Sequence, residues 1–376
     1  MRILIDYRPA LRERSGVGEY AHQLARALAQ ASPADEVVAF TSSWKDRPAA
    51  ESQAELHPAR ILDLRLPVRA LNLAWHRVGW PSIEQLTGAR YDVVHSPHPL
   101  LLPSRNAAQV VTIHDLDFLG HRDHVRAEIR RDYPALVGAH ARRADRIVTP
   151  SKYTAGLVER MLEVPSDRIS VCPEGAPEWP PGSSEQLPPR PPGYLLFVGT
   201  LEPRKNIRGL LAGYRALIGQ YPASPPLVLV GRATPEAAPW LRELREVPLA
   251  GRVEHLGYVN HESLRGVYTG AACLVLPSFD EGFGLPAVEA MALGVPVVAA
   301  NRGSLPEVVG DAALFVDPDD PAGLAVAIAR VLGEAGLRGE LAARGRARAR
   351  LYTWQRCAAL TREAYVQAME SRSRRT

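Results

Sequence analysis

Short hydrophobic runs alternate with amphipathic segments along most of this 376-residue chain. Residues 18–30 place Tyr20, Leu24 and Leu28 on one helical face, which is the spacing of a helix that packs on a core. Strands that alternate with helices are typical of parallel βαβ units, with helices on both faces of a sheet. The runs that predict strands are 2–6, 36–41, 93–95, 110–114 and 146–150 in the first half, and 194–199, 227–231, 253–256, 273–277, 295–300 and 313–316 in the second.

A proline-rich segment, residues 173–192, interrupts the alternation. Such a stretch cannot form a helix interior or a central strand, so it predicts an interdomain linker. The expected organisation is an N-terminal domain (residues 1–175), this linker, a C-terminal domain (193–350) and a terminal helix (351–376). The predicted fold class is therefore α/β, with two Rossmann-like doubly wound domains facing each other across a cleft. Folds of this kind bind ligands beyond the carboxyl ends of their strands.

The composition excludes several classes of protein. Hydrophobic residues make up 46% of the chain, yet no run approaches the roughly 18 apolar residues of a membrane-spanning helix. The first run, Ile3 to Ile5, stops at Asp6 and predicts a strand rather than a signal peptide, so we expect a cytoplasmic protein. The three cysteines lack a metal-ligand spacing, and a net charge of +4 is too small to indicate a nucleic-acid partner.

The segment 278–292 carries the most specific pattern in the chain. A predicted strand leads into a glycine-rich turn, Pro286 suits the first turn of a following helix, and Gly294 fits just beyond its end. Backbone amides of the turn can point at an anion near the helix N-terminus, and Glu281 and Glu289 can accept hydrogen bonds from sugar or ribose hydroxyls. The alternative, a tight turn with solvated glutamates, does not account for the whole string. The turn residues are Gly282, Phe283, Gly284 and Leu285.

A pair of adjacent cations follows another predicted strand. This strand ends at Gly199, and Arg204 and Lys205 come just before a helix predicted to start near Asn206. Two cations at the carboxyl edge of a parallel sheet can neutralise a diphosphate. An isolated Arg-Lys pair is more often a solvated basic loop, but a place at the mouth of a sheet favours phosphate binding.

The first half carries weaker signals. Gly16 and Gly18 predict a loop that lets the backbone approach a ligand, although the third glycine of a dinucleotide-binding fingerprint is missing. His114 ends a predicted strand and is a candidate site residue, whereas a lone histidine is more often structural. His95 and His98 follow a neighbouring strand, but the spacing of the three histidines matches no standard zinc motif, and we expect no metal.

At these residues the chain resembles the retaining glycosyltransferases of family GT4, which have the GT-B fold. The string from Glu281 to Glu289 resembles the E-x7-E motif of that family, and Arg204-Lys205 resembles its phosphate-binding pair. Gly16 to Gly18 resembles its N-domain glycine loop, and His114 lies where the family often places an active-site histidine. Residues 301–308 also fit the family pattern.

The resemblance implies a role for each residue. Arg204 and Lys205 would bind the donor diphosphate, Glu289 would bind ribose hydroxyls, and Glu281 would touch the donor sugar. Amides of the turn would support sugar or phosphate, while Tyr258 and Val259 would border the nucleobase. The last helix would cross back onto the N-terminal domain. No cofactor is implied, because the nucleotide-sugar donor is a substrate.

The resemblance also implies a mechanism and a class of substrates. Cleavage of the anomeric bond leaves negative charge on a nucleoside diphosphate, which cations and helix-end amides would stabilise. Retention implies attack from the leaving-group face, so no pair of catalytic carboxylates is required. Residues 199–206 and 114–119 resemble bacterial mannosyltransferases that use GDP-mannose, while UDP- and dTDP-hexoses stay open. The acceptor would be a growing surface polysaccharide or a lipid-linked saccharide.

Three other functions compete with this one. A nucleotide-sugar epimerase would need a different constellation of carboxylates and histidines, and a dehydrogenase would need the missing glycine fingerprint. A binding protein without turnover is the alternative from another class. We would expect such a protein to have lost Arg204, Lys205 or Glu289, but all three are present.

Two basic segments suggest contact with a membrane surface. Residues 64–80 combine Leu, Val and two Trp with three Arg. Arg122, Arg126, Arg130 and Arg131 follow helical spacing. Segments of this kind can lie on anionic lipid, here at the inner face of the plasma membrane. The alternative is an acceptor-site helix and a solvated helix face.

Overall fold

The computed structural model describes residues 1–11, 16–120, 127–179 and 191–374, and it divides into two compact units. The first unit comprises Met1–Glu174 and Trp354–Thr376, and the second comprises Gly175–Thr353. The second unit thus begins inside the predicted linker, whose residues 180–190 lie outside the described ranges. Within those ranges, no helix is both long enough and apolar enough to cross a membrane.

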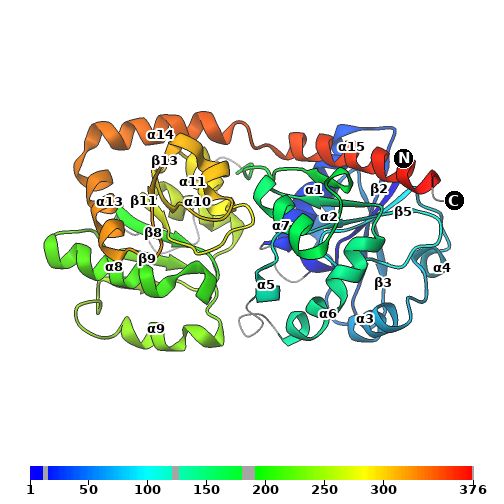
Figure 1. Cartoon of the computed structure of the whole chain (residues 1–376), viewed down its shortest axis with the longest axis horizontal. Coiled ribbons are helices and arrows are strands. Elements are labelled where there is room, and N and C mark those ends of the chain that lie inside the picture. The colour runs from blue at the N-terminus through cyan, green and yellow to red at the C-terminus, as the bar shows by residue number, and fades with distance from the viewer. Residues whose placement is uncertain (12–15, 121–126, 180–190, 375–376) are drawn as a thin grey trace. The chain divides into compact units, whose positions relative to one another are not determined.

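The first unit is built on a seven-stranded sheet in which all neighbouring strands are parallel (Figure 1). The chain moves outward from β1 on one side and from β4 on the other, so the topological switch point lies between these two strands. In spatial order the strands are β3 (Arg60–Leu64), β2 (Glu36–Ser42), β1 (Arg2–Asp6), β4 (Val93–Ser96), β5 (Ala108–Thr112), β6 (Arg146–Thr149) and β7 (Ile169–Val171).

Helices cover both faces of this sheet. Successive strand residues point to opposite faces, so Ile3 and Ile5 of β1 belong to one hydrophobic cluster and Leu4 to another. Both faces of the strands are therefore hydrophobic, as in parallel sheets that are buried on both sides. The first face packs against α1 (Val17–Ala31) and α15 (Trp354–Ser373); the second packs against α3 (Val68–Arg77), α4 (Ile83–Thr87), α6 (Ala127–Arg143) and α7 (Lys152–Leu162).

A buried chain of hydrogen bonds fixes α15 to the first sheet. Tyr365 Oη lies 2.7 Å from His95 Nδ1, and His95 Nε2 lies 2.8 Å from Thr112 Oγ1. The hydroxyl of Tyr20 extends the chain, 3.0 Å from the same Thr112 oxygen. Burial lowers the pKa of His95 to about 3, so the neutral imidazole accepts from one neighbour and donates to the other. His95 therefore serves the packing of α15.

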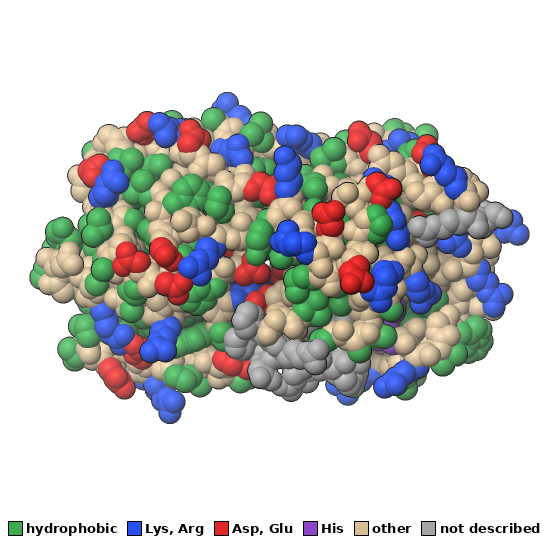
Figure 2. Space-filling view, in the orientation of Figure 1, with side chains coloured by type: hydrophobic (Ala, Val, Ile, Leu, Met, Phe, Trp, Pro, Cys, Tyr) green, Lys and Arg blue, Asp and Glu red, His purple; other side chains and the backbone are tan. Residues whose placement is uncertain are grey.

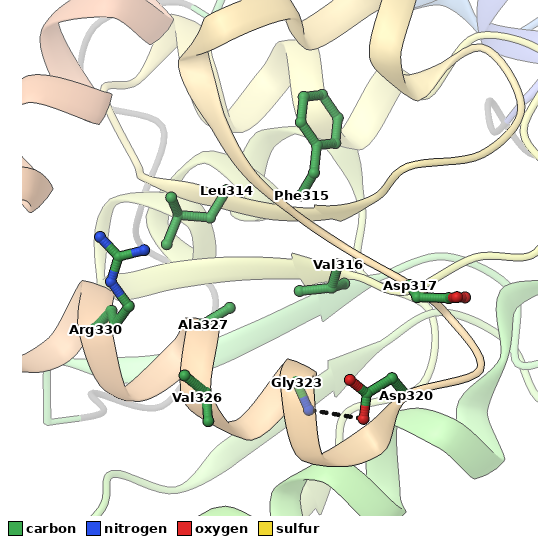
Figure 3. A pocket seen from close by; sticks show the side chains of 9 residues that line it. All are labelled: Leu314, Phe315, Val316, Asp317, Asp320, Gly323, Val326, Ala327 and Arg330. Carbon is green, nitrogen blue, oxygen red and sulfur yellow. Dashed lines mark hydrogen bonds between the residues drawn. The ribbon is translucent and has the colours of Figure 1, made fainter.

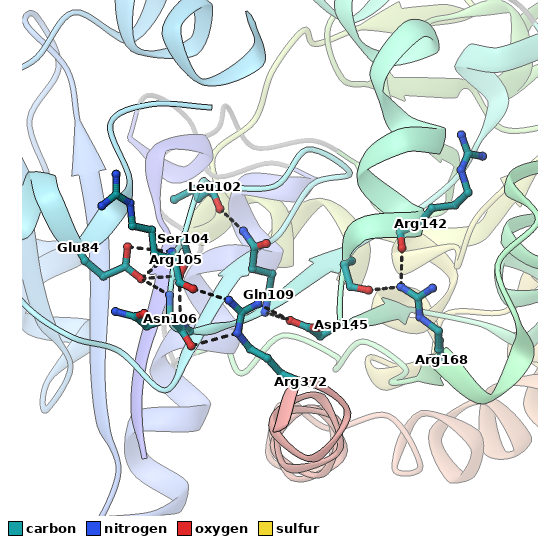
Figure 4. A network of polar contacts seen from close by, with 12 residues as sticks. Glu84, Leu102, Ser104, Arg105, Asn106, Gln109, Arg142, Asp145, Arg168 and Arg372 are labelled. Carbon is teal, nitrogen blue, oxygen red and sulfur yellow. Dashed lines mark hydrogen bonds and ion pairs between the residues drawn. The ribbon is translucent and has the colours of Figure 1, made fainter. Parts of the chain in front are cut away.

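Arg372, near the carboxyl end of α15, joins this helix to the loops that precede β5 and β6 (Figure 4). Its guanidinium donates to the carbonyls of Arg105 at 2.6 Å and Asn106 at 3.1 Å. It also lies 3.3 Å from Oδ2 of Asp145, a buried carboxylate that accepts from the amide of Gln109 at 2.9 Å. The last turn of α15 is thus held by a charge-assisted network.

We expect Arg372→Ala to lower the free energy of unfolding by about 1–3 kcal/mol, because two carbonyls lose a donor and the buried carboxylate of Asp145 loses one of its donors. Urea unfolding followed by circular dichroism measures the change. Arg374→Ala, which removes an exposed guanidinium from the end of the same helix, is the control. Equal midpoints for the two variants would mean that the network adds no net stability.

The second unit is built on a six-stranded sheet, again with parallel neighbours. Here the switch point lies between β8 and β11, and one continuous hydrophobic core packs on the sheet. The loops that leave these two strands carry the charged residues predicted from the sequence. In spatial order the strands are β10 (Val253–His255), β9 (Leu227–Val230), β8 (Tyr194–Val198), β11 (Ala271–Leu276), β12 (Val297–Ala300) and β13 (Ala313–Val316).

Candidate functional site

A single asparagine fixes the loop after β8. Asn206 has a left-handed conformation, with φ +55°, and its Oδ1 caps α8 (Ile207–Gln220) by accepting from the amide of Gly209 at 3.0 Å. Its Nδ2 donates to the carbonyls of Pro277 at 3.0 Å and Pro318 at 2.8 Å, just after β11 and β13. Because the two predicted cations immediately precede Asn206, this buried amide sets their position at the switch point.

Lys205 and Glu281 form a buried ion pair at this edge of the second sheet. The ammonium lies 2.7 Å from Oε1 and 2.6 Å from Oε2 of Glu281, and the two residues are only 8% and 4% exposed. Ser278 Oγ donates to Oε1 at 2.8 Å. Arg204 lies at the margin, 3.5 Å from Glu281 Oε2 and 2.9 Å from Glu202 Oε1. The structure thus pairs a predicted phosphate ligand with the predicted sugar ligand.

Two opposing effects act on the Glu281 carboxyl group. Burial, the largest single effect, raises its pKa, but the charges of Lys205 and Arg204 and the hydrogen bonds from Lys205 and Ser278 outweigh burial. The pKa of Glu281 therefore lies below its ordinary value of 4.5, and the group is ionised at neutral pH. Because Glu202 pairs with Arg204, the charges of the two cations and the two carboxylates in this cluster cancel. An anionic ligand gains most from this cluster by taking the place of a carboxylate.

Two glycines hold the turn after β11 close to its neighbours. Gly284 caps α11 (Leu285–Ala292) at φ +93°, and a Cβ there would lie 2.7 Å from Leu305 Cδ2. Gly303 has φ +64°, and a Cβ there would lie 2.8 Å from the backbone nitrogen of Glu281. A side chain at either position would push the Glu281 turn out of place.

The predicted turn residues divide between core and site. Gly282 and Phe283 are buried, and Leu285 is half-buried. The Phe283 ring packs edge-on against Tyr352, with centroids 5.4 Å apart. The Phe283 side chain therefore anchors the turn in the core, and its backbone amide is the part that stays a candidate for ligand binding.

Glu289, on α11, is held by a tyrosine that the sequence reasoning missed. Tyr268 of α10 (His261–Thr269) is fully buried, and its hydroxyl donates to Glu289 Oε2 at 2.5 Å. Burial, together with the charge of Glu289, raises the pKa of Tyr268 well above its ordinary value, which keeps the hydroxyl a donor. No local pattern marks Tyr268, because its partner lies 21 positions away.

The predicted nucleobase residues lie beyond β10. Gly257, at φ +68°, accepts at its carbonyl from the amide of Gly231 at 2.8 Å, which ties this loop to the end of β9. Tyr258 is partly exposed, and the Arg232 guanidinium lies 5.4 Å from its ring centroid. Val259 is buried. Tyr258 thus offers an aromatic surface at the same edge of the second sheet.

The predicted glycine loop of the first unit is partly outside the described residues, which omit 12–15. Gly16 has φ +52° and caps α1, and no atom of the described residues lies within 4 Å of where its Cβ would be. Gly18 is buried within the first turn of α1. Gly16 is thus required by its backbone conformation rather than by crowding.

His114 is bound by an acidic residue from the segment predicted to be a linker. Its Nδ1 lies 2.9 Å from Oε1 of the buried Glu174, and its Nε2 lies 3.2 Å from the carbonyl of Pro97. The Tyr20 ring packs edge-on against the imidazole, with centroids 4.6 Å apart. Both ring nitrogens therefore face acceptors inside the first unit. Sequence reasoning did not find Glu174, which lies 60 positions from its partner.

The three histidines near the carboxyl edge of the first sheet serve separate contacts. His95 binds Tyr365 and Thr112, His98 Nε2 lies 3.0 Å from Asp6 Oδ2, and His114 binds Glu174. In the described part of the chain, no three His, Cys, Asp or Glu residues are grouped so that they could hold a metal ion.

A surface hollow lies between β13 and α13 (Pro321–Gly333), and neither Lys205 nor Glu281 lines it (Figure 3). Its charged residues are already engaged. Asp320 caps α13 by accepting from the amide of Gly323 at 2.9 Å, Asp317 accepts from Arg302 at 3.2 Å, and Arg330 pairs with Glu334. The hollow therefore offers little polar chemistry, and the switch point of the second sheet is the better candidate site.

Comparison with known proteins bears on both units. Residues 14–178 match the family described as Glycosyltransferase Family 4, and residues 192–334 match the one described as Glycosyl transferases group 1. The chain is 33% identical to O-antigen chain mannosyltransferase B of Escherichia coli, over 97% of this chain and 99% of that protein. It is 29% identical to glycogen synthase of Mycobacterium tuberculosis, over 98% and 95% of the two chains.

A solved structure gives the same result for the fold. Sucrose-phosphate synthase from Thermosynechococcus elongatus matches with a TM-score of 0.76 at 26% sequence identity. The match covers 97% of this chain and 98% of that chain, so it extends over both units.

Proposed function

This chain belongs to glycosyltransferase family 4 and has the GT-B fold, with two Rossmann-like α/β domains, and on that premise we propose that it is a retaining mannosyltransferase acting in the cytoplasm. Its relatives support a hexosyltransferase that uses a nucleotide-sugar donor and a saccharide acceptor. The proposed donor is GDP-mannose, and the proposed acceptor is a saccharide or lipid-linked saccharide of a bacterial surface polymer. The relative named as an O-antigen mannosyltransferase supports this choice. UDP- and dTDP-hexoses are the alternative donors, since another relative is not named a mannosyltransferase but a glycogen synthase.

The observation that carries the proposal is the pairing of Lys205 with Glu281 at the switch point of the second sheet. In the proposed reaction the acceptor oxygen bonds to the anomeric carbon, the bond from that carbon to the diphosphate oxygen breaks, and the acceptor proton passes to a phosphate oxygen. Charge accumulates on the diphosphate, where Lys205 and Arg204 would stabilise it. Before the donor binds, Glu281 would hold Lys205 in place. When a donor phosphate replaces Glu281 as the partner of the Lys205 ammonium, the carboxylate would turn to the donor sugar.

The other site residues complete the proposed donor site. Glu289 would accept from ribose hydroxyls and Tyr258 would border the base, with Val259 beneath it. In the first unit, the family resemblance implies that His114 contacts a substrate and that Gly16 and Gly18 let the backbone approach a phosphate. The proposal needs no metal ion, because the two cations and the amides at the start of α11 supply the positive charge.

A thermal-shift titration against GDP, UDP, dTDP and their sugar conjugates tests the donor site. A ligand that binds only the folded chain stabilises it by about 2.7 kcal/mol at 100 times its Kd. We expect GDP and GDP-mannose to raise the Tm and the other nucleotides to have little effect. A shift with UDP or dTDP compounds alone would reassign the donor, and no shift with any nucleotide would overturn the donor site. Binding without release of nucleoside diphosphate in the presence of acceptors would favour a binding protein.

We expect Tyr268→Phe to weaken GDP binding about tenfold, because loss of one hydrogen bond to a charged group removes roughly 1.5 kcal/mol that orients Glu289. Isothermal titration calorimetry measures the Kd. Tyr194→Phe is the matched control, since it also removes a buried hydroxyl, one that donates to the carbonyl of Val267 in the same helix. Equal affinities in the two variants would show that Tyr268 acts on stability alone.

A further inference from the structure

Exposed hydrophobic side chains of the first unit gather in one place. Of the six large hydrophobic residues that are exposed among its described residues, all but Met161 lie at position 44 or between 66 and 80. Isolated exposed hydrophobics are ordinary, but a cluster marks an interaction surface. The members are Trp44 (72% exposed), Leu66 (38%), Leu73 (63%), Val78 (75%) and Trp80 (57%), and we call them the α3 surface.

The fold brings Trp44 and Leu66 to one edge of the sheet, next to the start of α3. Ser42 and Leu64 are register partners in the parallel strands β2 and β3, so Trp44 and Leu66 each lie two residues beyond neighbouring strand ends. A hydrogen bond of 3.0 Å from Ser42 Oγ to the carbonyl of Leu66 joins the two loops. The chain then enters α3 directly, and Trp80 follows its end.

Helix α3 has two opposite faces. Leu71 and Trp75 are buried and pack on the sheet, and the Trp75 ring lies 6.0 Å from that of Phe40. Arg69, Leu73 and Arg77 are four residues apart and lie on one exposed face, since residues at this spacing share a side of a helix. The exposed face thus mixes hydrophobic and basic side chains.

The segment from residue 64 to 80 carries positive charge only. Residues 64–80 contain Arg65, Arg69 and Arg77 and no acidic residue, and all three arginines are exposed. The nearest preceding carboxylate, Asp63, is paired with Arg47. Glu84, which follows, accepts from Ser104 and from the amides of residues 105 and 106 inside the unit. At the lower right of Figure 2, where Figure 1 places α3, basic and hydrophobic side chains lie next to each other.

We propose that the α3 surface binds the surface of an anionic lipid bilayer. Tryptophan and leucine would enter the boundary between headgroups and acyl chains, while Arg65, Arg69 and Arg77 would lie against lipid phosphates. Only the mixed hydrophobic and basic side chains of the exposed face would contact lipid, because the opposite face of α3 packs on the sheet. The inference does not depend on the proposed transferase activity, because bilayer binding needs neither donor nor acceptor.

Vesicle flotation of the full chain tests the proposal. Vesicles of phosphatidylcholine with phosphatidylglycerol are expected to bind the chain, and vesicles of phosphatidylcholine alone to bind it at least tenfold more weakly. High salt is expected to release it, whereas inorganic phosphate at equal ionic strength should release no more than chloride does. Equal binding to both vesicles, or no binding to either, overturns the proposal; specific release by phosphate indicates a discrete anion site and also overturns it.

Two sets of variants assign the binding to this surface. Trp44→Ser/Leu73→Ser/Trp80→Ser and Arg65→Gln/Arg77→Gln are each expected to lower the partition coefficient about tenfold or more. Tyr221→Ser/Val247→Ser/Val326→Ser and Arg208→Gln/Arg338→Gln change exposed residues of the second unit and serve as matched controls. Binding equal to that of the unchanged chain in both α3 variants overturns the assignment. The assignment is also overturned if gel filtration shows a dimer that the serine variant loses and the unchanged chain does not bind vesicles. A second copy of the chain would then occupy the α3 surface.

Discussion

Lys205→Ala is expected to lower kcat/KM for transfer by about 10²- to 10³-fold, the usual loss when one donor to a developing negative charge is removed. Lys205 is the most buried cation at the switch point, and its ammonium contacts both carboxylate oxygens of Glu281. In a site with little water, a fixed charge at the leaving group acts more strongly than in solvent. Initial rates of nucleoside diphosphate release, divided by the folded fraction from circular dichroism, measure the loss.

Two further variants serve as controls for this prediction. Lys205→Arg keeps the charge but not the size or geometry of the ammonium, and we expect it to recover only part of the activity. Lys152→Ala removes an exposed lysine at the start of α7 in the first unit and should leave kcat/KM unchanged. A Lys205→Ala rate within threefold of the unchanged enzyme would remove Lys205 from the proposed site.

Local turn chemistry could be predicted from the sequence because it depends on neighbouring residues only. Pro286 does lie in the first turn of α11, and Gly294 lies just beyond the helix end at φ +73°. Central strands were predicted within a few residues for the same reason, since both of their faces are hydrophobic. The predicted strand 110–114 ends earlier, at Thr112, although the amide of Ile113 still donates to the carbonyl of Val148 at 2.9 Å.

The strands that sequence reasoning missed are those at the edges of the first sheet. β3 and β7 are only half-buried for most of their length, and β7 has just three residues, so neither shows a continuous hydrophobic run. An edge strand is recognised by its neighbour in space, which the pattern of a single segment does not contain.

The partners inside the candidate site could not be predicted for a related reason. Lys205 and Glu281 are 76 positions apart, and their contact exists only after β8 and β11 pair. Without that contact, the sequence suggested a separate ligand group for each of them, phosphate for Lys205 and sugar for Glu281. Glu174 was hidden in a proline-rich segment, and Tyr268 is one of several buried tyrosines. Residue type and strand position locate an edge of a sheet, but the hydrogen-bond partners there follow from tertiary packing.

Glu281→Ala is expected to lower the free energy of unfolding of the second unit by about 3–5 kcal/mol, because it leaves the buried Lys205 ammonium without its partner.

The pH dependence of the free energy of unfolding should reflect the same carboxyl group. The folded-state pKa of Glu281 is depressed below 4.5, so its contribution is present above that pH and is lost as pH falls through the lower folded pKa. The stability gap between the unchanged chain and Glu281→Gln, measured by urea unfolding, should therefore narrow below about pH 4.5 and stay constant from pH 6 to 8.

Replacing both partners separates their two functions. Lys205→Met/Glu281→Met exchanges a buried ion pair for side chains of similar volume, and such exchanges are often neutral or stabilising by about 1–4 kcal/mol. We expect this double variant to be at least as stable as the unchanged chain and more stable than Lys205→Ala or Glu281→Ala, yet as inactive as Lys205→Ala. Urea midpoints and transfer rates on the same samples measure both quantities. A double variant that is stable and active would show that the ion pair is structural only. A double variant as unstable as the single variants would show that the side chains of Ser278 and Arg204 need polar partners that methionine does not supply.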